Sequence, residues 1–221
     1  MALLRIQPLH ILLAAALLLH GAGHAAPRAS KEIDRPTSAP YTGDLSIFED
    51  PQRDQNLQVN RVMDLLGIHG GSKVADIGAG GGWFSVRAAR RVGRAGTVYA
   101  IDINPPYVKS IAARAQHENM PNVRAILSRP DDPLLPPASV DAVLLLKTYH
   151  EIAQPMRLLR HVRAALRPRA RLGIIDRNGN GSDHGLDEKK VIEELSRAGF
   201  FLVAKYDFVK GDGDDYFLIF R

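Results

Sequence analysis

The sequence contains no cysteine, and its 221 residues include a single tryptophan. The absence of cysteine excludes disulfide bonds, thiolate nucleophiles and cysteine-ligated metal sites, and it is compatible with any redox compartment. Aromatic residues make up only 6% of the chain, and none lies within the two arginine-rich stretches, 87–94 and 157–171. Nucleic-acid grooves usually combine basic and aromatic side chains. We therefore expect these arginines on solvated helix faces and predict no nucleic-acid partner.

Apolar runs long enough to cross a membrane are also missing from the N-terminal segment. The run 11–19 has nine residues, whereas a membrane-spanning helix needs about 20. Arg5 precedes this run, and the small residues Gly23 and Ala25 follow it at the −3 and −1 positions of a cleavage site. This pattern is typical of a secretory signal. We expect residues 1–25 to be a cleavable signal peptide and the protein to be periplasmic or secreted, with an uncleaved anchor as the alternative.

The rest of the chain divides into a short connecting segment and one folded domain. Residues 26–52 are rich in Pro, Ser and Thr, which predicts a flexible linker. From residue 53 to residue 221, strand patterns alternate with helix patterns. The expected strands are 73–77, 97–102, 123–127, 140–147, 171–176, 200–208 and 216–220. This order predicts an α/β fold with a doubly wound, mostly parallel, seven-stranded Rossmann-like sheet that ends in an antiparallel hairpin.

A glycine-rich loop follows the first expected strand and leads directly into a helix. Such a loop brings bare backbone against a nucleotide-like ligand. Gly78, Gly80 and Gly82 are spaced G-x-G-x-G, and the dinucleotide fingerprint would need another glycine at the position of Trp83. This difference argues against a nicotinamide-dependent oxidoreductase. A glycine turn that serves only tight packing is the alternative.

Acidic residues recur where the expected parallel strands end. Asp76 and Asp102 end the first two strands, Asp131 follows the third and Asp176 ends the fifth. The carboxyl ends of parallel strands meet at one edge of the sheet, so these positions suggest a single ligand site. Asp102 comes 24 residues after Gly78, a spacing that suits an acidic residue that binds ribose hydroxyls. Its alternative role is to cap the following helix.

These features together resemble the class I S-adenosylmethionine-dependent methyltransferases. The resemblance rests on Asp76-Ile-Gly-Ala-Gly-Gly-Gly, Asp102, Asp141-Ala-Val-Leu-Leu-Leu before a loop, and the terminal hairpin, and it covers about residues 53–221. It is strongest toward bacterial small-domain enzymes that have Tyr149-His150-Glu151-Ile152 after the fourth strand. The resemblance implies methyl transfer from S-adenosylmethionine to a small-molecule or lipid-like acceptor. A catalytically silent binding module of the same fold is the alternative.

The resemblance also implies roles for individual residues. The positions implied to bind the cofactor are Asp76, Gly78, Gly80, Gly82, Asp102 and Asp131. Within this set, Asp76 corresponds to the position that binds the cationic amino group, Asp102 to the ribose position and Asp131 to the adenine position. Each assignment is an expectation for the structure to test.

The segment after the fourth strand supplies the candidate catalytic residues. His150 is the candidate general base, because the ordinary pKa of histidine lies near neutrality, and Glu151 is placed to orient it. A purely structural histidine is the alternative. Tyr149 either contacts the acceptor or packs in the core. No histidine has metal-ligand spacing along the sequence, so we expect no metal.

Overall fold

The computed structural model describes residues 35–221. The expected signal peptide, residues 1–25, therefore lies outside the described residues. Within the described part of the chain, no helix combines the length and the apolar character needed to cross a bilayer.

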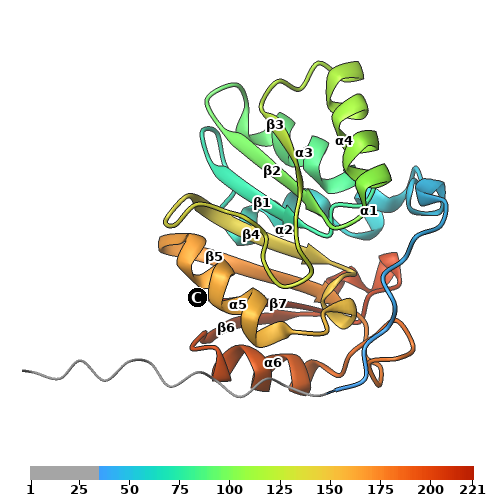
Figure 1. Cartoon of the computed structure of the whole chain (residues 1–221), viewed down its shortest axis with the longest axis vertical. Coiled ribbons are helices and arrows are strands. Elements are labelled where there is room, and N and C mark those ends of the chain that lie inside the picture. The colour runs from blue at the N-terminus through green and yellow to red at the C-terminus, as the bar shows by residue number, and fades with distance from the viewer. Residues whose placement is uncertain (1–34) are drawn as a thin grey trace, which may run out of the picture.

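A seven-stranded sheet runs through the centre of the molecule, in the order β3-β2-β1-β4-β5-β7-β6 (Figure 1). The strands are β1 (Lys73–Ile77), β2 (Thr97–Asp102), β3 (Val123–Leu127), β4 (Val140–Leu146), β5 (Leu166–Asp176), β6 (Leu202–Tyr206) and β7 (Tyr216–Phe220). The first five strands are parallel, whereas β7 pairs antiparallel with both β5 and β6. The fold expected from the sequence is confirmed, including its terminal antiparallel pair.

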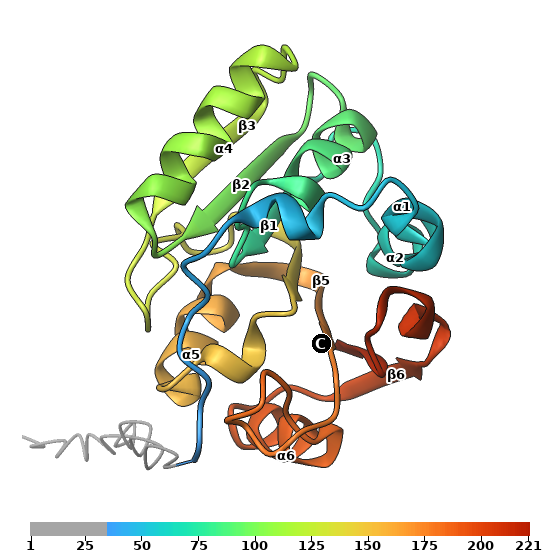
Figure 2. The same cartoon turned by 90° about the vertical axis from the view of Figure 1, so that its right-hand side faces the viewer.

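Helices cover both faces of the sheet (Figure 2). They are α1 (Arg53–Asn56), α2 (Val59–Leu66), α3 (Trp83–Val92), α4 (Pro105–His117), α5 (Pro155–Ala165) and α6 (Glu188–Arg197). One apolar cluster joins the sheet to α5 and α6, and a second joins it to α2 and α3. Apart from Asp141, strand β4 is apolar because its side chains enter both clusters: Val143 and Leu145 face the first, and Leu144 faces the second.

Residues 35–52 form a segment that lies along the domain, and we call it the N-terminal strap. The guanidinium Nε of Arg35 donates to Glu194 Oε1 at 2.9 Å. The backbone N–H of Ser38 donates to the carbonyl oxygen of His150, and that of Tyr41 donates to Glu151 Oε1. The strap is the described part of the segment 26–52 that the composition predicts to be a linker, and residues 26–34 of that segment lie outside the described residues. Its attachments are single polar contacts to distant residues, which leave no periodic pattern in the sequence.

The buried ion pair at the start of the strap yields a stability prediction. Arg35 and Glu194 have side chains that are 4% and 0% exposed. We expect Arg35→Ala to lower the free energy of unfolding by about 3–5 kcal/mol, because it leaves the Glu194 carboxylate buried without its cation. Lys190→Ala removes an exposed pair with Glu193 and should cost less than about 1 kcal/mol. Urea unfolding measures both, and equal losses in the two variants would contradict the prediction.

Candidate functional site

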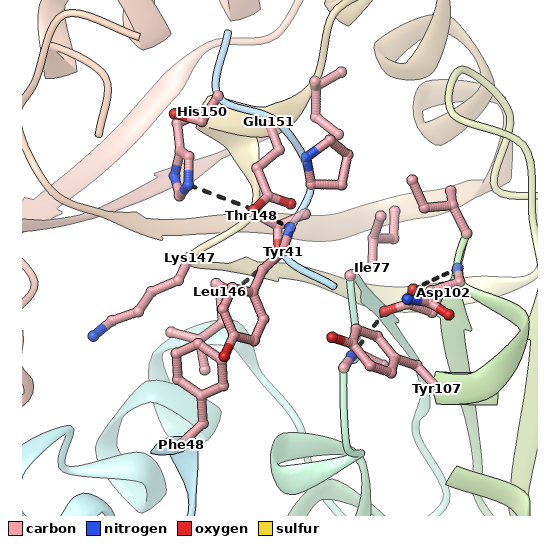
Figure 3. A pocket seen from close by; sticks show the side chains of 18 of the residues that line it. Tyr41, Phe48, Ile77, Asp102, Tyr107, Leu146, Lys147, Thr148, His150 and Glu151 are labelled. Carbon is pink, nitrogen blue, oxygen red and sulfur yellow. Dashed lines mark hydrogen bonds and ion pairs between the residues drawn. The ribbon is translucent and has the colours of Figure 1, made fainter. Parts of the chain in front are cut away.

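A cavity of about 1120 Å³ opens at the carboxyl ends of the parallel strands (Figure 3). The glycine loop after β1 and the end of β2 form one side, and the loops after β4 and β5 form the other. The strap contributes apolar and aromatic lining through Tyr41, Leu45 and Phe48. The cavity thus lies where the sequence pattern places a ligand site.

The glycine loop is held in a conformation that requires glycine. Gly78 and Gly80 have φ angles of 75° and 53°, in the left-handed region. A Cβ atom at Gly78 would also overlap the side chain of Thr148, which follows β4. The loops after β1 and β4 therefore approach each other more closely than any other residue at position 78 would allow.

Asp102 connects the glycine loop to the start of α4. Its Oδ2 accepts the N–H of Gly80 at 2.9 Å, and its Oδ1 accepts the N–H of Asn104 at 2.9 Å. Burial raises the pKa of this carboxyl, while these backbone hydrogen bonds oppose the rise. Asp102 lines the cavity. The two roles that the sequence leaves open, a ligand contact and a contact at the helix start, are both compatible with this position.

Two buried carboxyl groups make another part of the cavity acidic. Burial raises the pKa of Asp76 to about 7, against an opposing hydrogen bond from Ser85 Oγ at 2.6 Å. Burial also raises the pKa of Asp214 to about 7, and no hydrogen-bond donor reaches either of its oxygens in the described part of the chain. Lys147 Nζ lies 3.5 Å from Asp214 Oδ1. Both carboxyls line the cavity and would gain from a cationic ligand group.

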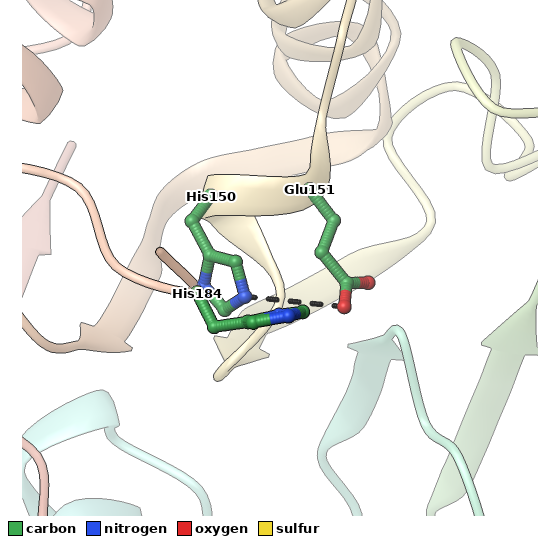
Figure 4. A group of neighbouring side chains, drawn as sticks. All are labelled: His150, Glu151 and His184. Carbon is green, nitrogen blue, oxygen red and sulfur yellow. Dashed lines mark ion pairs between the residues drawn. The ribbon is translucent and has the colours of Figure 1, made fainter. Parts of the chain in front are cut away.

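His150 is the centre of a polar cluster at the β4–β5 side of the cavity (Figure 4). Its Nδ1 lies 2.9 Å from both carboxylate oxygens of Asp176, so we assign Nδ1 as the protonated nitrogen. Its Nε2 lies 3.9 Å from Glu151 Oε1, and its ring meets the ring of His184 edge-on at a centroid distance of 5.7 Å. Burial raises the pKa of Glu151 to about 6. In the assigned tautomer, Nε2 therefore carries the lone pair of the ring and lies beside a carboxyl group.

The structure brings most of the expected site residues together. The expected residues that line the cavity are Asp76, Gly78, Gly80, Asp102, His150 and Glu151. Asp176 and His184 also line it. The sequence places Asp176 at a strand end, but only the fold shows that it holds His150. His184 borders the loop after β5, a position from which the sequence allows either a substrate contact or a solvated side chain.

Three expected site residues lie outside the cavity lining. Tyr149 is fully buried and its hydroxyl donates to Glu194 Oε2 at 2.9 Å, so it packs in the core, which is one of the two roles that the sequence leaves open. The carboxylate of Asp131 pairs with Arg157 at 3.1 Å, and Ser128, Arg129 and Pro130 line the cavity in its place. Gly82 serves the turn instead: it precedes α3 in a left-handed conformation.

Comparisons with known proteins agree with this geometry. Residues 74–169 match the family model of a methyltransferase domain. Nocamycin O-methyltransferase from Saccharothrix syringae is 39% identical over 83 residues, which are 38% of this chain. The match spans only 30% of that protein's length.

Solved structures share the fold at lower identity. A SAM-dependent methyltransferase from Aquifex aeolicus has a TM-score of 0.72 and 24% identity, over 81% of this chain and 98% of that one. The [4+2]-cyclase SpnF has a TM-score of 0.65 and 18% identity, over 86% of each chain. Fibrillarin from Aeropyrum pernix, solved with natively bound S-adenosyl-L-methionine, has a TM-score of 0.56 and 16% identity, over 73% of this chain and 74% of that one.

The raised pKa of Asp76 predicts how stability depends on pH. A carboxyl with a folded-state pKa near 7 and an unfolded pKa near 3.9 binds its proton more tightly when folded, so it lowers stability as pH rises between these values. Asp102 and Arg53 also act on this group, in opposite directions. We expect Asp76→Asn to be more stable than the parent by an amount that grows from pH 4 to pH 7 and is constant above. Thermal unfolding across this range measures the difference, and a constant difference at all pH values would contradict the assignment.

Proposed function

We propose that the chain carries a class I S-adenosylmethionine-dependent methyltransferase domain and that it methylates a small-molecule or lipid-like acceptor. The observation that carries the proposal is the single cavity that joins the glycine loop and Asp102 to the His150–Asp176 pair. One side has the groups that a nucleoside cofactor needs, and the other has a group able to accept a proton. The cavity is therefore suited to hold cofactor and acceptor together.

The residues of the cavity fit the chemistry of S-adenosylmethionine. The carboxylate of Asp102 suits ribose hydroxyls, because hydrogen bonds to an ionised acceptor are strong and directional. The glycines at 78 and 80 leave room for backbone approach, and the acidic groups Asp76 and Asp214 suit the cationic part of the cofactor. When bound, the cofactor supplies a methyl group already activated on a positively charged sulfur. The protein then has mainly to align the acceptor and exclude water.

The position of the strap along the cavity is an argument for an acceptor of limited size. It places Tyr41, Leu45 and Phe48 along the cavity, and the side chain of Leu45 lies 3.6 Å from the position that a Cβ of Gly80 would occupy. A partly apolar cavity of this size favours a small or lipid-like molecule over a polymer. The match to nocamycin O-methyltransferase, whose name specifies transfer to oxygen, favours a hydroxyl acceptor.

His150 is proposed to take the proton of that hydroxyl. Its Nδ1–H is held by Asp176, which leaves the lone pair of Nε2 available. Transfer of the methyl group to the acceptor oxygen would break the methyl–sulfur bond and release the cofactor as a neutral thioether. The proton of the hydroxyl would pass to Nε2, and the buried Asp176 carboxylate would stabilise the imidazolium. Glu151, which is fixed by the N–H of Tyr41, lies beside this nitrogen.

The alternative is a binding protein without transferase activity. The fold alone does not require methyl transfer, since SpnF, which shares it, is a [4+2]-cyclase. The two proposals differ in a direct experiment: the protein is incubated with methyl-labelled S-adenosylmethionine and with fractionated metabolite and lipid extracts. Label in an extract component supports the enzyme and identifies the acceptor. Tight cofactor binding without labelled product in any fraction would favour the binding module.

Asp102 and Asp131 form a matched pair for a test of cofactor binding. Loss of a charge-assisted hydrogen bond costs about 1.5–3 kcal/mol, so Asp102→Ala should weaken S-adenosylmethionine binding by about 10- to 100-fold. Asp131→Ala should leave affinity unchanged, because that carboxylate pairs with Arg157 outside the cavity. Calorimetry measures both variants. Parental affinity in Asp102→Ala would refute the cofactor site.

His150→Asn tests the proton acceptor with little change in the surroundings. The side-chain N–H of asparagine can replace the Nδ1–H that Asp176 accepts, whereas nothing replaces Nε2. We expect kcat to fall by about 10²- to 10⁴-fold with cofactor affinity unchanged. Single-turnover kinetics with the identified acceptor measure the fall, and parental turnover would show that no base acts at this position.

We also propose that the protein is exported. The support is the sequence pattern of Arg5, the apolar run 11–19 and the small residues at 23 and 25. S-adenosylmethionine is made in the cytoplasm, so an exported enzyme requires a supply of cofactor. Cell fractionation followed by N-terminal sequencing should find the protein outside the cytoplasm with a start near Ala26. An intact Met1 on cytoplasmic protein would overturn this proposal.

A further inference from the structure

We propose that His150, Glu151 and His184 form a binding site for one divalent transition-metal ion of the zinc class. The sequence gives no sign of such a site, because the two histidines lie in different loops, after β4 and after β5. The inference does not depend on methyl transfer, since ion binding can be measured without cofactor or acceptor.

The three side chains converge on one point (Figure 4). One ligand atom from each residue lies within 4.8 Å of the others, and His150 Nε2 is 3.9 Å from Glu151 Oε1. Zinc binds nitrogen and oxygen at about 2.0–2.2 Å, which places neighbouring ligand atoms about 3.3 Å apart. The cluster therefore has to contract by roughly 1 Å. His184 is exposed on its loop and Glu151 is only half-buried, so both can move inward.

Asp176 prepares His150 for this role. The wholly buried Asp176 carboxylate holds Nδ1–H with both oxygens at 2.9 Å and also accepts the backbone N–H groups of His150 and Arg177. A histidine that ligates a metal usually donates its other N–H to a carboxylate in this way, which fixes the tautomer and the ring orientation. The free lone pair of Nε2 is thereby directed to the cluster.

The strap contacts all three ligand residues. The hydroxyl of Ser38 accepts the N–H of His184 at 2.8 Å, while the N–H of Ser38 donates to the carbonyl of His150 at 3.3 Å. The N–H of Tyr41 donates to Glu151 Oε1 at 3.1 Å and leaves Oε2 without this contact. Three loops that are distant in sequence are thus held in register around the cluster.

The donor set selects the class of ion. Two imidazole nitrogens and one carboxylate suit zinc and its first-row neighbours, whereas magnesium and calcium prefer oxygen ligands. Three protein ligands leave a further coordination position, and all three residues line the cavity. An oxygen atom of a molecule in the cavity can occupy that position. The ion and a proton compete for Nε2 of His150, so this residue cannot be ligand and proton acceptor at once.

The experiment compares the full-length protein with three variants, all without a histidine tag. His184→Ala and Glu151→Gln each remove one ligand. His161→Ala is the matched control, because His161 is an exposed histidine whose Nδ1 lies 3.8 Å from a carboxylate oxygen of Asp132 but which has no third ligand in the described part of the chain. Zinc affinity and stoichiometry are measured by competition with a chromophoric chelator, and Co²⁺ binding by visible absorption. The histidines at positions 10, 20 and 24 are present in every protein and contribute equally.

The parent and His161→Ala should bind the ion alike. Compared with His184→Ala, each should bind one more ion per chain or bind the ion at least about tenfold more tightly. Glu151→Gln should show the same loss. Thermal unfolding of each variant reports whether it is folded, and exposed His184 can be removed without opening the core. Equal zinc affinity and stoichiometry in the parent and His184→Ala would overturn the proposal, as would an unchanged Co²⁺ spectrum. If the parent transfers methyl groups but zinc binding is the same in the parent and in His184→Ala, the metal site alone is refuted. If the parent binds zinc at this site but labels no acceptor, the enzymatic function alone is refuted.

Discussion

The parallel pairing of β1 with both β2 and β4 is the constraint on which the rest of the structure depends. The chain moves outward from β1 through β2 to β3, and then returns to add β4 and β5 on the other side. The connections after β1 and β4 therefore run in opposite directions, and a crevice opens between them at the carboxyl ends of the strands. Gly78 and Thr148 border this crevice from the two sides. The strand order alone therefore determines where the cavity lies, and the side chains determine what it can bind.

This topology gathers carboxyl groups that would be unfavourable elsewhere in a core. Asp76, Asp102, Asp176 and Asp214 are all buried at the same edge of the sheet. Asp102 and Asp176 have backbone N–H donors, whereas Asp214 has only Lys147 at ion-pair distance. Desolvation of such groups lowers the stability of the fold, and the two apolar clusters on the faces of the sheet have to compensate. A cationic ligand reduces this cost, so binding and stability are coupled at this edge.

Local patterns were sufficient to predict the strands, the glycine loop and Asp102. Each depends on residues close in sequence: apolar runs form the strands, Gly78 and Gly80 adopt left-handed conformations, and Asp102 directly ends β2. The sequence left two roles open for Tyr149, and its position in the core depends on Glu194 on α6, 45 residues later. The position of Asp131 outside the cavity lining likewise depends on a distant residue, Arg157 on α5, with which its carboxylate pairs. His184 reaches the site only because Ser38 and the loop after β5 place it there.

The strap has a kinetic consequence. Its contacts extend from Glu194 at one end to Arg114, which pairs with Glu49, at the other, and Tyr107 donates to the carbonyl of Gly43 between them. In this arrangement the strap lies over part of the glycine loop, and Leu45 is the nearest side chain to the position that a Cβ of Gly80 would occupy. A molecule that enters or leaves past these contacts has to wait until several of them break together. Exchange with solvent is then timed by the opening of the strap, and the residence time of a bound molecule reflects the strength of the strap's own contacts as well as those of the ligand.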